Sequence, residues 1–306
     1  MQGWSDTFAR LGSRILNAAV LLEHSHADDS GSHSQNHGYL RLPILLRLLG
    51  FFLIDAAHQV SSSSVWDEET LVRVFKIALQ TCRVCLDNNE TELAMKVLQR
   101  CSDFTSIVEE DASMDQIAIG VSYSRTNNPL AIRHLVVLYY ILRLLHASKT
   151  DRTDLTSHLY TKIDKQELEG SADLTEKAAE VLHIVGKAYQ AREAWDEITK
   201  WCQRALLATL RNRVEHQSQY RSELRLAITT TAVAAYLRNG SPNSFIQANR
   251  LVEELADTNA TCYQLGPDIL RFHILIATPR PDLSEVDDVV FRMIRSTWLT
   301  DRTFEL

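Results

Sequence analysis

Two cysteines, Cys82 and Cys85, form a Cys-x-x-Cys motif, a spacing found in zinc sites and in dithiol redox centres. A structural zinc site needs a second pair of ligands at matching distance, and the sequence offers none. A redox motif opens a helix that follows a strand, whereas this motif lies on the apolar face of a predicted helix. We therefore expect packed core thiols and assign no metal ligand. The five cysteines have no regular spacing, which is typical of a reducing compartment.

A group of four histidines, His24, His26, His33 and His37, lies in the polar stretch 24–38. Imidazoles are common metal ligands, but nothing rigid in this stretch would hold the four rings in a fixed geometry. Its Ser- and His-rich composition predicts a flexible surface loop. We expect a solvated linker and no metal site.

Neighbouring acidic residues at 109–111, 253–254 and 287–288 have the residue type of a general acid and base. Such a pair needs a buried carboxyl group with a shifted pKa, and these residues fall at helix ends or on exposed faces. The serines at 61–64 lack the strand–turn–helix context of a nucleophile elbow, and no phosphate-binding glycine loop is present. The sequence therefore predicts a protein that is not an enzyme, with no cofactor and no small-molecule substrate.

The elements around these residues are predicted to be helices. Hydrophobic residues make up 45% of the 306 residues, whereas glycine and proline number only 10 and 6. A β-rich fold needs far more turn residues, and all six prolines can be placed at or just before helix starts. Apolar residues recur at i, i+3, i+4 and i+7 over most of the chain, so we predict an all-α fold.

Charge and hydropathy restrict the partners. The net charge is −7, and the lysines and arginines are scattered, so no basic face for direct nucleic-acid binding is predicted. The most apolar run, 42–54, is too short for a bilayer span and carries Arg47, which favours a buried helix over a membrane segment. No apolar segment of a secretory signal follows Met1. We expect protein partners and no membrane association.

The helical pattern divides the chain into an N-terminal helix at 1–23, the flexible loop at 24–38 and a repeat domain at 39–306. Within this domain, helices joined by short turns are expected to form antiparallel pairs. The clearest predicted pairs are 67–86 with 93–108, 174–191 with 194–217, 223–238 with 245–256, and 267–277 with 283–296.

Repeated helix pairs of this length are typical of tetratricopeptide proteins, whose signature includes W-x2-L-G-x2-Y in the first helix. In the pair that begins at 174, the matching residues of the two helices are Leu182, Val185, Gly186 and Tyr189, then Ile198, Cys202 and Ala205. Two other pairs match the second half of the signature. We predict a tetratricopeptide-like, right-handed α-solenoid of antiparallel helix pairs; an irregular helical bundle is the alternative.

A solenoid offers an extended surface for polypeptide partners. Trp201 is expected to pack in the core beside Cys202, whereas Trp195 lies near the turn, where core packing and a partly exposed anchor are both open. The candidate partner-binding residues are Tyr189, Arg192, Trp195 and Lys200.

The segment 157–209 carries three short motifs in order. They consist of Tyr160, Lys162 and Ile163, then Gly186, Lys187 and Tyr189, then Lys200, Trp201, Arg204, Ala205 and Leu206. With flanking stretches at 73–104 and 291–306, this order resembles the meiosis-specific Zip-four / sporulation-protein-twenty-two family. Ile198, Cys202 and Gln203 depart from the family pattern.

The resemblance implies a scaffold in the nucleus, on meiotic chromosomes. Such a scaffold would bind crossover-promoting proteins of the ZMM group and chromosome-axis proteins, and would support recombination, synapsis and chromosome segregation. The alternatives are a general tetratricopeptide adaptor in another nuclear or cytosolic complex, and an all-helical enzyme or ligand-binding domain.

The resemblance also implies a longer array, because family members are considerably longer than this chain. Three explanations of the shorter length are open: an N-terminal part that lacks further C-terminal repeats, a truncated gene model, or a divergent paralogue. The final residues retain Trp298, Leu299, Phe304 and Leu306. We expect these four side chains to pack on neighbouring helices or to be covered by further repeats.

Overall fold

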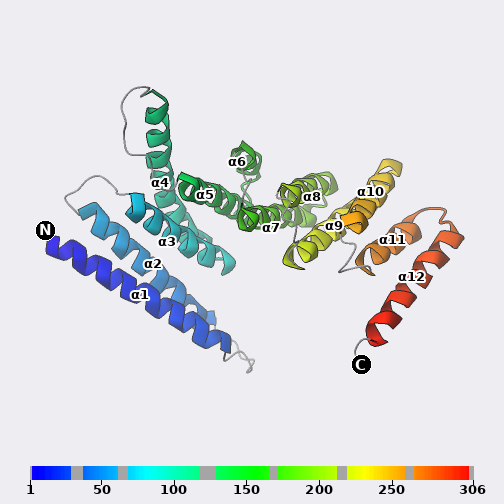
Figure 1. The fold of residues 1–306 in the computed structure, drawn as a ribbon, viewed down its shortest axis with the longest axis horizontal. Helices are drawn as coiled ribbons and strands as arrows, with labels where there is room; N and C mark the ends of the chain where they lie inside the picture. The colour runs from blue at the N-terminus through cyan, green and yellow to red at the C-terminus, as the bar shows by residue number, and fades with distance from the viewer. Residues whose placement is uncertain are drawn as a thin grey trace. The chain divides into compact units, whose positions relative to one another are not determined.

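The computed structural model describes residues 2–28, 37–60, 68–117, 129–165, 171–211, 219–258 and 265–302, and these are helical apart from short turns (Figure 1). No strand occurs in these ranges, which confirms the predicted all-α fold. The helices are α1 (Gln2–Asp28), α2 (His37–Val60), α3 (Glu68–Asp87), α4 (Thr91–Ile117), α5 (Pro129–Lys149), α6 (Thr153–Lys165), α7 (Ala172–Ala188), the 3-10 turn η1 (Gln190–Arg192), α8 (Trp195–Leu210), α9 (Gln219–Asn239), α10 (Pro242–Thr258), α11 (Leu265–Ala277) and α12 (Leu283–Arg302).

The chain forms two compact units, Met1–Gln166 with α1 to α6 and Glu167–Leu306 with α7 to α12. Helix α1 packs along α2 inside the first unit, and the boundary between the units follows Gln166. The predicted domain limits at 1–23, 24–38 and 39–306 stay a prediction. The sequence pattern shows that a helix has an apolar face but does not show which helix covers that face. Boundaries between groups of helices therefore cannot be derived from periodicity alone.

Two local predictions near the N-terminus differ from the structure. Helix α1 continues to Asp28, beyond the predicted loop start at 24, because the added residues include no glycine or proline to end it. Of the four clustered histidines, His24 and His26 are therefore in α1 and His37 begins α2, while His33 lies outside the described residues. Pro43 lies inside α2 rather than at its start.

The hairpin of α3 and α4 buries the Cys-x-x-Cys motif completely. The thiols of Cys82 and Cys85 on α3 and of Cys101 on α4 are free and have no exposed surface. Burial is the main cause that raises the pKa of Cys85 to about 11, so this thiol stays protonated at neutral pH. The packed core thiols are confirmed. Within the described ranges, no group of three or more His, Cys, Asp or Glu side chains is placed to hold a metal ion.

A buried ion pair links α2 to α4 in the first unit. Asp55 is 3% exposed, and both of its carboxylate oxygens accept hydrogen bonds from the guanidinium of Arg100 at 2.9–3.0 Å. Arg100 also bonds Asp103 at 2.9 Å and lies 4.8 Å from the centre of the Phe104 ring. This cluster therefore fixes the N-terminal hairpin on the next one.

By length and composition alone, two helical segments could cross a membrane, Arg41–Val60 in α2 and Leu130–Lys149 in α5. In α5, 61% of the apolar window is buried, as in the core helix of a folded unit. In α2 the buried share is 39%, and Leu42, Leu45 and Leu49 are exposed. The predicted burial of this apolar run therefore holds for only one face of α2.

The last helix, α12, exposes apolar side chains at Leu283, Phe291 and Ile294. Trp298 and Leu299 belong to the same helix, but their side chains lie outside the described part of the chain, as do Phe304 and Leu306. The predicted packing of these four side chains therefore stays a prediction.

Candidate functional site

The candidate site is built on the hairpin of α7 and α8 in the second unit. Ser171 caps α7 by accepting a hydrogen bond from the backbone N–H of Leu174 at 3.3 Å, which explains why the helix begins there. The two helices cross at Gly186, where an added Cβ would lie 3.2 Å from the Cβ of Trp201. A larger side chain would hold the helices apart, so the small residue of the signature stands at the crossing, as its spacing predicts.

Trp201 fills the centre of this crossing. Its side chain has no exposed surface, and the Arg204 guanidinium lies 4.4 Å from its ring centre. Cys202 and Ala205, on the same face of α8, are also fully buried. The predicted core position of Trp201 is therefore confirmed.

Helix α9 packs against both α7 and α8, and two polar contacts fix it to α7. Arg221 donates to the Glu176 carboxylate at 3.1 Å, and His183 Nε2 lies 2.8 Å from the Thr231 hydroxyl. The Thr231 hydroxyl donates its proton to the carbonyl of Ala227, so its oxygen accepts from the Nε2–H of a neutral His183.

Burial, and secondarily the charge of Lys187, lowers the pKa of His183 to about 4. In the unfolded chain this imidazole titrates near 6.5, so between these values the unfolded state binds more protons than the folded state. Stability from this group is therefore fully present above about pH 6.5 and is lost as the pH falls toward 4. From pH 7.5 to pH 5 we expect a loss of about 2 kcal/mol through His183.

Urea unfolding at the two pH values measures this effect, with the His183→Gln variant as the control. Glutamine keeps a donor for Thr231 but does not titrate, so the variant should lack the contribution of His183. An equal pH dependence in the variant and the original protein would contradict the burial-based explanation.

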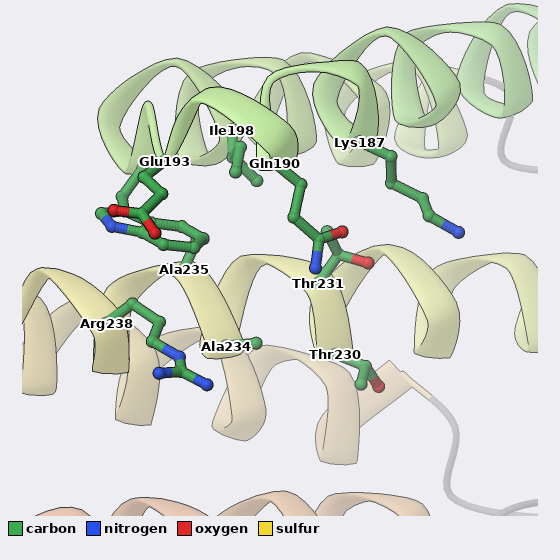
Figure 2. A pocket seen from close by; sticks show the side chains of 10 residues that line it. Lys187, Gln190, Glu193, Ile198, Thr230, Thr231, Ala234, Ala235 and Arg238 are labelled. Carbon is green, nitrogen blue, oxygen red and sulfur yellow. The ribbon is translucent and has the colours of Figure 1, made fainter.

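A groove with a volume of about 460 Å³ runs between the α7–α8 hairpin and α9 (Figure 2). Lys187 lies at one end of it, and Glu193 and Arg238 lie at the other end on opposite walls. Gln190 reaches toward Thr231 in the middle. The full lining is Lys187, Gln190, Glu193, Trp195, Ile198, Thr230, Thr231, Ala234, Ala235 and Arg238. This volume suits a few residues of a polypeptide or a small molecule.

Three charged side chains line the groove. Within the residues that the structure describes, Lys187, Glu193 and Arg238 make no side-chain hydrogen bond or ion pair. Outside the groove the pattern is different, since Lys200 on α8 pairs with Glu197 at 3.2 Å. Charges of both signs are therefore available to a ligand in the groove.

Glu193 has a strained backbone at the mouth of the groove. It stands in the left-handed region, with φ of 54°. The turns after α3 and α5 have the same local geometry, with Asn89 and Asp151 in that position. In all three turns the left-handed residue donates its N–H to the carbonyl three residues back, and the next residue donates to the carbonyl five back. Asn and Asp tolerate this conformation, but Glu does not favour it.

We expect Glu193→Gly to be more stable than Glu193→Ala by about 0.5–1 kcal/mol. Glycine adopts positive φ without strain, whereas alanine keeps the strain, and both variants lose the carboxylate. Thermal unfolding of the two proteins checks this difference. Equal stability of the pair would mean that the turn relaxes and that Glu193 carries no strain.

The four predicted partner-binding residues lie in different environments. Trp195 is half-buried and lines the groove. Tyr189 is half-buried at the C-terminal cap of α7, and Arg192 is exposed in η1. Lys200 is exposed in an ion pair. The structure therefore brings Trp195 into the groove and leaves the other three outside its lining.

Sequence reasoning missed six polar groove residues, Lys187, Gln190, Glu193, Thr230, Thr231 and Arg238. Lys187, in the last turn of α7, and Gln190, at the start of η1, are three residues apart, a spacing that places them on one side of a helix. That spacing was the available signal. Arg238 stands on another helix, and nothing in the sequence shows that α9 forms the second wall.

Comparison with protein-family profiles matches residues 146–306, just over half of the chain, to the family described as "Meiosis protein SPO22/ZIP4 like". The match includes the whole second unit. No curated protein and no solved structure matches the chain significantly. The predicted resemblance to this family is confirmed, and the segment 157–209 and the flank 291–306 lie inside the matched residues, whereas the flank 73–104 lies outside them. The chain belongs to the SPO22/ZIP4-like family of meiosis proteins.

Proposed function

We propose that this meiosis protein is a non-enzymatic scaffold that binds crossover-promoting proteins of the ZMM group and chromosome-axis proteins. The family match is the observation that carries the proposal, because it assigns a meiosis-related role to the chain. On this proposal the protein acts in the nucleus, on meiotic chromosomes, and supports recombination, synapsis and chromosome segregation.

Helix packing in the second unit supports a tetratricopeptide-like, right-handed solenoid as the form of the scaffold. Each helix contacts the next one along the chain from α7 to α12, and α9 also contacts both α7 and α11. In a solenoid of helix pairs, the first helices of successive pairs lie side by side and form one continuous surface. The groove lies between the α7–α8 hairpin and α9, and on this proposal α7 and α9 are two such helices.

The groove supports binding of polypeptides rather than catalysis. It presents a half-buried indole, Trp195, beside charged side chains that have no ion-pair partner among the described residues. Aromatic side chains are frequent anchors at protein interfaces. His183, next to the groove, is bonded to Thr231 and has a lowered pKa. The Thr231 hydroxyl donates its proton to the Ala227 carbonyl and accepts from the imidazole, so His183 is not oriented as a base toward this hydroxyl.

Tagging the protein in meiotic cells tests the proposal. We expect discrete foci on prophase chromosomes and co-purification of crossover-promoting and axis proteins. A diffuse cytosolic signal throughout prophase, with no such proteins recovered, would contradict it. The Trp201→Ala variant is a suitable negative control, because loss of the core crossing should remove both foci and partners.

A further inference from the structure

A second hollow adjoins the groove and shares two of its residues. It has a volume of about 330 Å³ and is lined by Glu193, Ala194, Trp195, Asp196, Glu197 and Asn239. Three acidic residues therefore gather on this side of Trp195. Asp196 accepts a hydrogen bond from Asn239 at 2.8 Å and Glu197 pairs with Lys200, while Glu193 has neither kind of partner among the described residues.

The two hollows together form a surface with an order of charge along it. Lys187 stands at the far end of the groove, and the acidic hollow adjoins the end that holds Glu193 and Trp195. A ligand that spans both would meet the Lys187 cation at one end. At the other end it would meet the indole and the Glu193 carboxylate, with the Arg238 guanidinium on the opposite wall. Because Glu193, Asp196 and Glu197 outnumber Arg238 there, the surface is complementary to an acidic side chain at Lys187 and to an apolar and a basic side chain at the other end.

Polar side chains in the groove can form hydrogen bonds with the backbone of an extended chain. The Gln190 amide can donate and accept, and within the described residues it makes no hydrogen bond. A helical ligand satisfies its own backbone groups, whereas an extended segment presents free N–H and C=O groups to such an amide. The wall of α9 from Thr230 to Arg238 extends about 12 Å, which an extended chain covers in about four residues.

We propose that the Trp195 groove and the adjoining acidic hollow bind a short extended segment of a partner protein. In this segment an acidic side chain pairs with Lys187, an apolar side chain packs on Trp195 and a basic side chain pairs with Glu193. This inference rests on the proposed function, since it names the kind of segment that the scaffold takes up. The strained backbone of Glu193 supports the proposal. Asn or Gly would be more stable in this left-handed conformation, so a carboxylate is present here despite the strain.

Fluorescence polarisation with two labelled peptides tests the proposal on the full-length protein. The probes are Glu-Ser-Leu-Ser-Lys and Ser-Ser-Leu-Ser-Ser, which lacks both charges, each with blocked ends. Because the charged side chains of the first peptide pair with Lys187 and Glu193, we expect it to bind saturably and about tenfold more tightly than the second. A version of the first peptide with serine in place of leucine should bind more weakly than the first peptide.

The decisive variant is Lys187→Glu, with Lys177→Glu as the matched control. Both lysines are on α7, where Lys187 is exposed and Lys177 is partly buried, and Lys177 lies outside the groove lining in a pair with Asp173. We expect Lys187→Glu to weaken the preferred peptide about tenfold and to bind a peptide with lysine in place of glutamate more tightly than the original protein does. Lys177→Glu should leave both affinities unchanged.

Several results would overturn the proposal. These are no saturable binding of either peptide, equal affinity for both, or the same loss with Lys187→Glu and Lys177→Glu. Sedimentation of the original protein and of Trp195→Ala tests whether a second copy of the chain occupies the groove. Self-association that is lost in the variant would show that it does. Chromosomal foci that persist in Lys187→Glu without peptide binding would refute this inference and leave the proposed function standing.

Discussion

Replacing Trp201 by alanine is expected to lower the free energy of unfolding by about 3–5 kcal/mol. The side chain has no exposed surface and stands where α7 and α8 cross, next to Gly186. Removing it deletes the largest fully buried side chain among the described residues of the second unit and leaves a cavity that the close helix contact cannot readily fill. Urea unfolding followed by circular dichroism measures the loss.

Trp195→Ala is the matched control, because it removes the same side chain from the start of the same helix. Trp195 is half-buried and lines the groove, so its loss should cost about 1 kcal/mol or less. The two variants should therefore separate stability from binding: Trp201→Ala unfolds more easily, and Trp195→Ala loses partners. Similar losses of stability in both would mean that Trp195 belongs to the core.

The burial of one of these two tryptophans could be predicted from the sequence, and the burial of the other could not. The helical phase of Trp201 relative to Cys202 and Ala205 placed it in the core, because these two residues occupy signature positions whose contacts are local to one hairpin. Trp195 stayed ambiguous from sequence. Its exposure depends on the turn conformation and on α9, and periodicity describes neither.

The groove itself could not be predicted, because its two walls come from segments far apart in the chain. Lys187 and Arg238, at opposite ends of the groove, line the same groove because α7 packs on α9 and His183 contacts Thr231. These contacts depend on tertiary geometry. The strain at Glu193 was equally invisible, since a glutamate in a turn does not by itself reveal a positive φ.

The all-helical fold and the hairpins were predictable for a physical reason. A helix stripe at i, i+3, i+4 and i+7 and a short turn are local properties of the chain. The division into two units after Gln166 was not predictable, because it depends on which apolar helix faces pack against each other.

In the first unit, Arg100→Ala is expected to lower the free energy of unfolding by about 3–5 kcal/mol. The substitution leaves the Asp55 carboxylate, only 3% exposed, with hydrogen bonding from Gln59 at 2.7 Å but without its cation. It also removes the contact of the guanidinium with the Phe104 ring. Urea unfolding measures this loss as well.

Asp55→Ala should cost less, because the charge that it leaves behind is better placed. The Arg100 side chain is 20% exposed and keeps its bond to Asp103, so solvent and a second carboxylate stabilise the remaining cation. We expect about 1–3 kcal/mol for this variant. The order of the two losses tests whether the cost comes from an uncompensated buried charge or from lost packing.

The double variant, Asp55→Ala with Arg100→Ala, separates these causes. If an uncompensated buried carboxylate dominates, removing it as well should recover at least about 1 kcal/mol of the loss in Arg100→Ala. If the two losses simply add, the pair contributes through independent packing contacts and the electrostatic explanation is wrong. Because Asp55 and Arg100 connect α2 to α4, the recovered double variant should still show weaker protection of α2 from hydrogen exchange than the original protein.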